Sequence, residues 1–195
     1  MVQDDPPPPS AVVGDVTPYA VPVVVEDYDP AWPDLFQQEH DAIRGALGAT
    51  AMTVEHVGST SVPGLPAKPV IDVLLLVPDS ADERTYVPAL EEAGYTLRIR
   101  EPAWLEHRVL YRRLEDGSPH NVNVHVFSPG RADAEIARMR MFRDWLRAHP
   151  DDRELYAATK RELATRRWRY VQDYADAKTE VVEAILARAG APATP

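Results

Sequence analysis

The part of the chain that determines its fold class is residues 57–77, which read VGSTSVPGLPAKPVIDVLLLV. The second half, Pro69–Val77, is the most hydrophobic run in the sequence, and its branched side chains predict a central strand covered on both faces. The first half is rich in glycine, proline and hydroxylated residues, as is typical of a loop. Asp72 interrupts the apolar run, and a carboxylate is costly to bury unless it binds a metal ion or accepts hydrogen bonds.

The loop before this strand has the composition of a phosphate site. Gly58 permits a positive φ angle or a close approach. Hydroxyl and backbone N–H donors for phosphate oxygens come from the next three residues, Ser59, Thr60 and Ser61. Lys68 adds a point charge. With Asp72, these groups would hold a nucleoside triphosphate through a hard cation such as Mg²⁺. The alternative is an ordinary glycine–serine turn whose N–H groups are satisfied by Asp72.

Helices and strands mix on both sides of this stretch. Before it we expect an edge strand at Val21–Val25, a helix that begins at Asp29-Pro30, and a strand at Thr50–Val57. After it, Ser80 and Glu83 resemble a capping box that opens a helix to about Ala93. Three further strands are expected at Tyr95–Arg100, Val109–Leu114 and Asn121–Phe127, the last two joined through Asp116-Gly117.

The last third of the chain has a helical pattern. It runs from Arg131 to Ala189, and Pro150 divides it. Together with the strands before it, this pattern predicts an α/β (α+β) fold. The expected architecture is a mixed β-sheet flanked by helices, followed by a helical C-terminal third.

Length and composition predict one domain. The chain has 195 residues and no cysteine, which excludes disulfides and thiolate metal sites. We expect a disordered proline-rich tail over residues 1–18, a single domain over 19–190 and a flexible end over 191–195. No apolar run approaches membrane-spanning length and the start does not resemble a signal peptide, so we expect a cytoplasmic protein without a membrane partner.

The charge pattern favours a small anionic ligand. The formal net charge is −10, and an acidic body does not attract a nucleic-acid duplex over long range. Within it, five arginines fall close together in the sequence: Arg98, Arg100, Arg108, Arg112 and Arg113. A local basic patch in an acidic shell suits a phosphorylated small molecule. The alternative is a solvated hairpin edge, which often carries charge.

The stretch from Val57 to Asp72 closely resembles the signature of the GrpB family. The resemblance covers about residues 20–190 and includes Tyr28–Trp32, Gly94-Tyr95, His125–Phe127, Phe142–Pro150 and Tyr156–Ala164. It implies a nucleotidyltransferase-like fold, in which a Gly-Ser turn grips the triphosphate. Two carboxylates one residue apart on the next strand, and a third on a later strand, would hold two Mg²⁺ ions. The chain keeps Gly58-Ser59 and Asp72, but it has Leu74 at the second position.

Other side chains must then replace the missing carboxylates, because two-metal chemistry needs several hard ligands. Alternation along Asn121–Phe127, which carries no acidic residue, puts Asn121, Asn123 and His125 on one face. We expect Asn123 and His125 to join Asp72 in a site for Mg²⁺ or Mn²⁺. His56 is a further acid–base or phosphate-binding candidate, with a structural histidine as the alternative.

Three cations away from the loop are also candidates for binding an anion. Arg112 belongs to the arginine cluster described above. Arg143 and Lys160 lie in the two C-terminal strings that resemble GrpB helices, and the resemblance implies that they close over an anionic substrate.

The leading hypothesis is a metal-dependent nucleotidyltransferase. ATP or another nucleoside triphosphate would bind on Gly58–Ser61, with Asp72, His125 and His56 as the catalytic candidates. A small acceptor would attack the α-phosphorus, or a carboxylate would be activated as an acyl-adenylate for ligation. The rival is a degenerate nucleotide- or protein-binding module, supported by Leu74. A third hypothesis is a metal site of His56, His125 and Asp72 for non-nucleotide chemistry.

Overall fold

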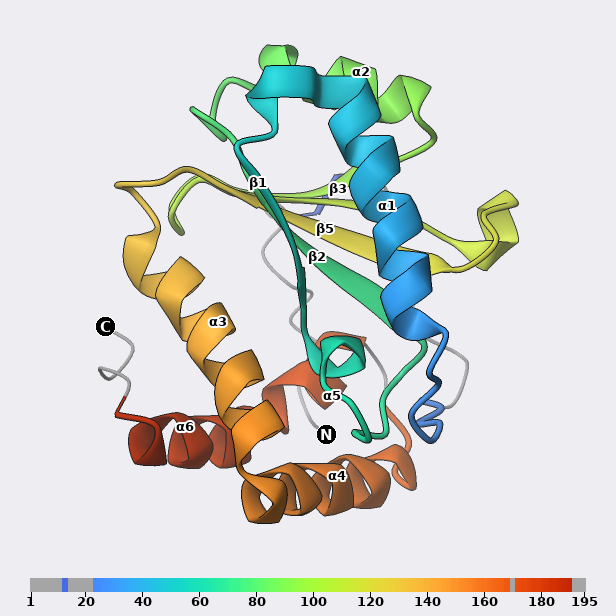
Figure 1. Ribbon diagram of the computed structural model, residues 1–195, viewed down its shortest axis with the longest axis vertical. Coiled ribbons are helices and arrows are strands. Elements are labelled where there is room, and N and C mark those ends of the chain that lie inside the picture. The colour runs from blue at the N-terminus through green and yellow to red at the C-terminus, as the bar shows by residue number, and fades with distance from the viewer. Residues whose placement is uncertain (1–11, 14–22, 169–170, 191–195) are drawn as a thin grey trace, which may run out of the picture.

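A five-stranded mixed sheet forms the centre of the computed structural model, which describes residues 12–13, 23–168 and 171–190 (Figure 1). The strand order is β1-β2-β5-β4-β3. The strands are β1 (Thr53–Val57), β2 (Val70–Leu76), β3 (Thr96–Glu101), β4 (His107–Arg112) and β5 (Asn121–Phe127). Strands β2 and β5 pair in parallel, and the other neighbours are antiparallel. The mixed α/β class predicted from the sequence is therefore confirmed.

Strand β2 is the central strand that the apolar run predicts. It lies between β1 and β5, and five of its seven residues are buried. One face of the sheet carries Ile71, Val73 and Leu75, which belong to the largest hydrophobic cluster. Helix α1 (Trp32–Leu47) and helix α2 (Val87–Glu92) cover that face (Figure 1). This two-layer half of the molecule fixes β2 and so fixes Asp72.

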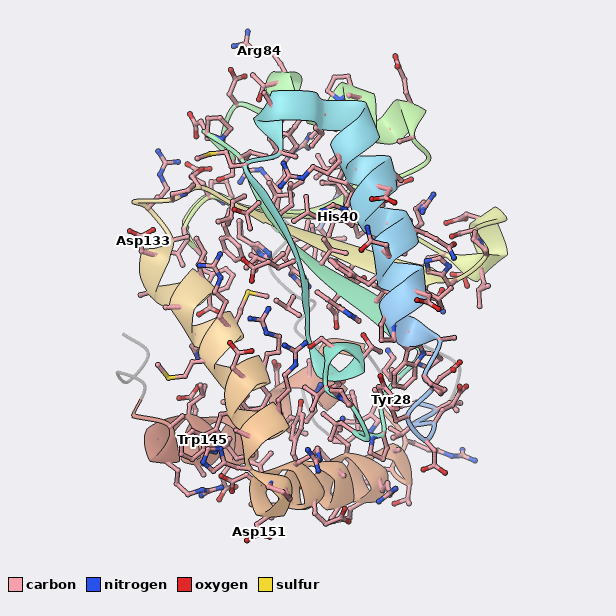
Figure 2. All side chains as sticks on the ribbon, in the orientation of Figure 1. Tyr28, His40, Arg84, Asp133, Trp145 and Asp151 are labelled. Carbon is pink, nitrogen blue, oxygen red and sulfur yellow. The ribbon has the colours of Figure 1, made fainter. Side chains whose placement is uncertain are left out.

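The opposite face of the sheet meets the C-terminal helices. Leu74, Leu76 and Phe127 pack on the first turns of helix α3 (Asp133–Ala148) through Ile136. The remaining helices are α4 (Pro150–Ala164), α5 (Val171–Asp176) and α6 (Thr179–Arg188). Leu146, Tyr156 and Ile185 join α3, α4 and α6, and Trp145 lies at this junction (Figure 2). The helical third expected from the sequence is confirmed, and it closes over part of the sheet face that carries Asp72.

Several expected elements differ from the structure. Strand β4 lies two residues earlier than expected, and helix α1 begins at Trp32 rather than at Asp29-Pro30. In the described part of Val21–Val25 no strand forms, and a single bridge nearby joins Glu26 to Ala67. Strand β1 begins at Thr53, because Gly48–Thr50 form a 3₁₀ turn. The expected helix from Ser80 is shorter, a 3₁₀ turn at Glu83–Thr85 followed by α2.

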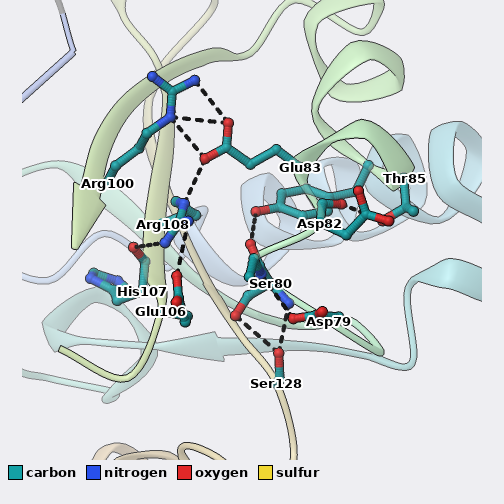
Figure 3. A network of polar contacts seen from close by, with 12 residues as sticks. Asp79, Ser80, Asp82, Glu83, Thr85, Arg100, Glu106, His107, Arg108 and Ser128 are labelled. Carbon is teal, nitrogen blue, oxygen red and sulfur yellow. Dashed lines mark hydrogen bonds and ion pairs between the residues drawn. The ribbon is translucent and has the colours of Figure 1, made fainter. Parts of the chain in front are cut away.

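The predicted capping box is wrong because Ser80 has other partners. Its side-chain oxygen accepts the Ser128 hydroxyl over 2.9 Å, its backbone N–H donates to Ser128 Oγ over 2.6 Å, and its carbonyl accepts the Tyr86 hydroxyl over 2.7 Å (Figure 3). Ser80 is fully buried, and it ties the end of β2 to the end of β5. A local sequence pattern does not reveal a partner 48 residues away.

The chain ends lie mostly outside the described residues. This applies to the expected tail over 1–18, apart from residues 12–13, and to the flexible end over 191–195. Val12 and Val13 pair with the edge of β3, where the Val13 N–H donates to the Arg98 carbonyl over 2.7 Å. The expectation of a disordered tail over residues 1–18 stays a prediction. None of the helices in the described ranges is both long and apolar enough to cross a membrane.

Candidate functional site

A cavity of about 340 Å³ lies between the sheet and the C-terminal helices. Its lining includes Gly58 and Ser59 from the β1–β2 loop, and Asp72, Asn123 and His125 from β2 and β5. The helical third contributes Met139, Lys160, Tyr174 and Lys178. Lys68, from the end of the same loop, completes the cationic part of the lining. The residues predicted to form a phosphate site are thus partly brought together.

Gly58 and Asp72 are fitted to each other. Gly58 has φ of +69°, a left-handed conformation that side-chain-bearing residues rarely adopt. A Cβ atom at this position would lie 2.4 Å from Asp72 Oδ2 and 2.9 Å from Asp72 Cβ. Antiparallel pairing of Val57 with Asp72 sets this contact, since it puts the loop directly over the carboxylate. Glycine is required here by both the backbone angle and the space available.

Asp72 is held as a carboxylate. Burial raises its pKa, but the neighbouring His125, the hydrogen bond from the Asn123 amide and the Lys178 charge together hold the pKa below its ordinary value. Asn123 Nδ2 donates to Asp72 Oδ1 over 2.9 Å. His125 Nε2 is 3.7 Å from the same oxygen. The floor of the cavity therefore presents one ionised carboxylate, flanked by an amide and an imidazole.

All three lysines of the chain line this cavity. The sequence has 21 lysines and arginines in total, and only Lys68, Lys160 and Lys178 are lysines. Lys178 was not among the residues predicted from the sequence. Lysine is rare beside arginine in this sequence, but the three lysines are far apart along the chain, and only the structure shows that they meet in one cavity.

The cavity lowers the pKa of each of these lysines. Burial, with the nearby charges of Lys178 and Arg161, lowers the pKa of Lys160 to about 7. Burial also lowers the pKa of Lys68 and of Lys178, against the opposing charge of Asp72. The Lys160 ammonium donates to the Pro66 carbonyl and lies 4.6 Å from the centre of the Tyr156 ring. Three partly desolvated amines facing one carboxylate leave the cavity suited to an anion.

His56, Thr60 and Ser61 do not line the cavity; they hold the loop that does. His56 is on the other face of the sheet, stacked on Phe36 with ring centres 4.7 Å apart. Burial lowers the pKa of His56 to about 4, so the ring is neutral near pH 7. The Thr60 hydroxyl donates to the Val70 carbonyl, so it accepts the His56 Nε2–H over 3.0 Å. This position separates His56 from His125, and the hypothesis of a metal site from His56, His125 and Asp72 is wrong.

The Ser61 hydroxyl is also used inside the loop. It donates to the Gly58 carbonyl over 2.6 Å, while the Ser61 carbonyl accepts both Nε and Nη2 of Arg147. Thr60 and Ser61 are buried. Of the predicted hydroxyl cradle, only Ser59 reaches the cavity.

The arginine cluster does not form an open basic patch. Glu83 binds both Arg100 and Arg108, and Glu106 also binds Arg108 (Figure 3). Arg112 is on the α1 face, where it binds the buried Glu39. Arg113, its neighbour, points to the other face and donates to Asn123 Oδ1 over 2.7 Å. Arg113, which directly follows β4, is therefore the arginine on the side of the site, rather than the predicted Arg112.

Arg143 is bound away from the cavity. It donates to Glu55, to Asp144 and to the His56 carbonyl. Arg140 shares the same Glu55 carboxylate. These partners compensate the charge of Arg143, which does not line the cavity as Lys160 does.

The donor set does not fit the two-metal site that the family resemblance implies. Asn123 donates its N–H to Asp72, and its oxygen accepts Arg113, so a metal ion at that oxygen would lie against the guanidinium charge. In the described ranges no three side chains of histidine, cysteine, aspartate or glutamate are grouped to hold a metal ion. Asp72 alone supplies a hard carboxylate, whereas two Mg²⁺ ions require several.

Comparison with known proteins identifies the family. The GrpB protein family model matches residues 22–188. The chain belongs to the GrpB family. It is 56% identical over 179 residues to a UPF0157 protein of Halalkalibacterium halodurans, covering 92% of this chain and 88% of that protein. It is 44% identical over 174 residues to a UPF0157 protein of Streptomyces coelicolor, covering 89% of this chain and 88% of that protein.

A GrpB crystal structure shares the architecture. The GrpB protein of Enterococcus faecalis superposes with a TM-score of 0.71 at 29% identity, covering 85% of this chain and 96% of that chain. The family match reaches from the residues before α1 to the end of α6, so the sheet and the helices that complete the cavity both belong to the GrpB unit. The resemblance noted in the sequence is confirmed.

Proposed function

We propose that this GrpB protein binds a polyphosphate, with a nucleoside triphosphate such as ATP as the expected ligand, and acts as a nucleotidyltransferase-type enzyme on a small acceptor. One observation carries the proposal: every lysine of the chain lines the cavity that also contains Gly58, Ser59 and Asp72. Lysine binds phosphate as a mobile point charge. The volume of about 340 Å³ lies within the range of small-molecule sites.

The lysines supply the positive charge that metal ions would otherwise supply. Three ammonium groups face one carboxylate, and a triphosphate would restore the balance of charge. Gly58 lets the phosphates approach the backbone of the loop, since no side chain intervenes. The proposal therefore needs no metal ion, and the Mg²⁺ or Mn²⁺ expected from the sequence remains a prediction that the same binding experiment tests.

The proposed reaction is an in-line transfer at the α-phosphorus. A lone pair of the acceptor oxygen or nitrogen forms the new bond to phosphorus. The bond between the α-phosphorus and the bridging oxygen breaks, and its electrons leave with pyrophosphate. The acceptor proton passes to the floor of the cavity, where Asp72 and His125 lie. Neutralisation of the leaving pyrophosphate by lysines lowers the barrier electrostatically.

A second candidate function is a polyphosphate-binding module without catalysis. The single carboxylate favours it, because Leu74 occupies the neighbouring inward-facing position in the apolar cluster against α3. The two candidates differ in one measurement, pyrophosphate release from ATP offered with amine, hydroxyl and carboxylate acceptors. Release that is lost in Asp72→Asn, while ATP binding persists, supports the enzyme. Binding without release in every case supports the module.

Removal of one cavity lysine is expected to weaken polyphosphate binding strongly. Lys160→Met should raise the Kd for inorganic triphosphate and for ATP by about 30-fold or more. The reason is that the bound phosphate would lose the buried ammonium with which it forms an ion pair. Titration calorimetry with and without EDTA measures the Kd and the effect of metal ions. Arg166→Met is the matched control, since it removes one exposed cation that pairs with Glu162. Equal affinity in wild type and Lys160→Met would contradict the proposal.

Binding should also depend on pH through Lys160. Its pKa of about 7 means that the ammonium is present at pH 6 and largely lost at pH 8. Affinity for triphosphate should fall by about tenfold across this range, measured relative to Lys160→Met at the same pH. Calorimetry at pH 7.5 in buffers of different ionisation enthalpy should show proton uptake on binding. A proton balance of zero would mean that Lys160 is not charged by the ligand.

A further inference from the structure

Four side chains form a row, called here a chain, that runs across neighbouring strands of the sheet and ends in the cavity. Glu101 Oε2 is 2.7 Å from His107 Nδ1. His107 Nε2 is 3.2 Å from His125 Nδ1. His125 Nε2 then faces Asp72 Oδ1 at 3.7 Å. Strands β3, β4, β5 and β2 each contribute one member, and register pairs Glu101 directly with His107.

The two imidazoles in this chain are held in fixed orientations. Their planes differ by 5°, with ring centres 5.4 Å apart. His107 also stacks on Phe127 at 4.5 Å and meets the edge of the Trp104 ring at 5.1 Å. Only 5% of His107 is exposed. Each ring nitrogen of the two histidines faces one partner, so hydrogen-bond roles can be assigned from one end of the row to the other.

The assignment starts at Glu101, because a carboxylate oxygen only accepts. His107 Nδ1 must therefore carry the hydrogen. Burial lowers the pKa of His107, despite the opposing effect of Glu101, so its Nε2 is a bare acceptor. His125 Nδ1 must then donate to it. With the hydrogen on Nδ1, the His125 Nε2 atom keeps its lone pair, and its 3.7 Å distance to Asp72 Oδ1 is too long for a hydrogen bond that would require a hydrogen there.

We propose that Glu101 and His107 are positioning residues that fix His125 as the Nδ1–H tautomer, and that His125 Nε2 is the base that accepts the proton of the acceptor substrate. The catalytic part rests on the proposed function. A hydroxyl or amine acceptor loses its proton to Nε2 as its oxygen or nitrogen bonds to phosphorus. The imidazolium that forms is stabilised by Asp72 on one side and by Glu101, through His107, on the other.

The two carboxylates compete for the orientation of the chain. Asp72 would favour the reverse order, with Nε2–H of His125 donating to it and Nε2–H of His107 donating to His125. Glu101 wins in the structure because its contact is shorter, 2.7 Å against 3.7 Å. Removal of Glu101 should therefore reverse both tautomers, whereas removal of Asp72 should leave them as they are.

Long-range ¹H–¹⁵N correlation of the imidazole nitrogens in the ligand-free protein tests the inference. In the wild type, His125 is expected to show protonated Nδ1 and bare Nε2. In Glu101→Ala the two nitrogens should exchange roles. Glu106→Ala is the matched control, because that carboxylate binds Arg108 and has no place in the chain. A wild-type His125 with protonated Nε2, or an unchanged tautomer in Glu101→Ala, would overturn the inference.

The experiment separates this inference from the proposed function. The tautomer is read without nucleotide, so a failure of ATP to bind does not affect it. If Glu101→Ala does not fold, Glu101→Gln gives the second test, since its amide can donate to His107 Nδ1 and permit the reversed order. Where turnover is observed, His107→Phe should lower kcat more than it changes KM. An equal change in both would contradict the positioning role.

Discussion

Replacement of Glu39 by leucine is expected to lower the melting temperature by about 6–20 °C, a larger loss of stability than we expect from any other single substitution proposed for this protein. Glu39 is fully buried in α1. It accepts the Tyr95 hydroxyl over 2.5 Å, binds the Arg112 guanidinium, and lies 2.9 Å from His120 Nε2. Leucine would leave Arg112 as an uncompensated charge under the helix, at a cost of about 3–5 kcal/mol in the free energy of unfolding.

Thermal unfolding followed by circular dichroism measures this effect. Asp27→Ala is the matched control, because that carboxylate is 93% exposed and its pair with Arg161 contributes little. The double variant Glu39→Leu with Arg112→Met should recover part of the loss, since no charge is then left without a partner. A melting temperature unchanged in Glu39→Leu would show that the buried cluster does not stabilise the fold.

Gly58→Ala should both destabilise the fold and abolish polyphosphate binding. The added Cβ would overlap Asp72 Oδ2 at 2.4 Å, and φ of +69° is unfavourable for alanine. The backbone angle alone costs about 1–2 kcal/mol. Relief of the overlap must move either the loop or the carboxylate, and both belong to the cavity. We expect the Kd for triphosphate to rise by about 100-fold, which corresponds to a loss of about 3 kcal/mol.

Gly64→Ala is the control for this variant. Gly64 lies in the same loop at φ of +77°, but nothing lies within 4 Å of its added Cβ. It carries the cost of the backbone angle without the overlap. A comparison of the two variants by calorimetry and thermal unfolding therefore isolates the contact with Asp72. If both variants bind triphosphate equally well, the close fit of Gly58 to Asp72 has no role in the ligand site.

The strands of the sheet, and which residues lie on which of its faces, could be predicted from local patterns. The apolar run around Asp72 has only one reasonable structure, a strand covered on both faces, and β2 is such a strand. Alternation in β5 correctly assigned Asn123 and His125 to the face of Asp72, because a strand has a period of two. Helix α1 followed from its apolar spacing, although it begins at Trp32 rather than at the predicted Asp29-Pro30.

The partners of these residues could not be predicted, because they come from distant parts of the chain. Lys178 reaches the cavity only through the turn between α5 and α6, and Glu101 meets His107 only through the β3–β4 register. The basic patch predicted from the arginine cluster was wrong for the same reason. A sequence shows that arginines are close together, but the strand alternation and the acidic residues opposite decide whether their charge remains available.

Because all lysines lie in one cavity, chemical modification of lysine can report on the occupancy of that cavity. Every side-chain primary amine of the chain belongs to the wall of the proposed site. A reagent that acylates amines therefore has no side-chain target on the outer surface, where arginine supplies the cations. The extent of acylation becomes a measure of occupancy, and any cellular metabolite that protects these amines is a candidate for the natural ligand.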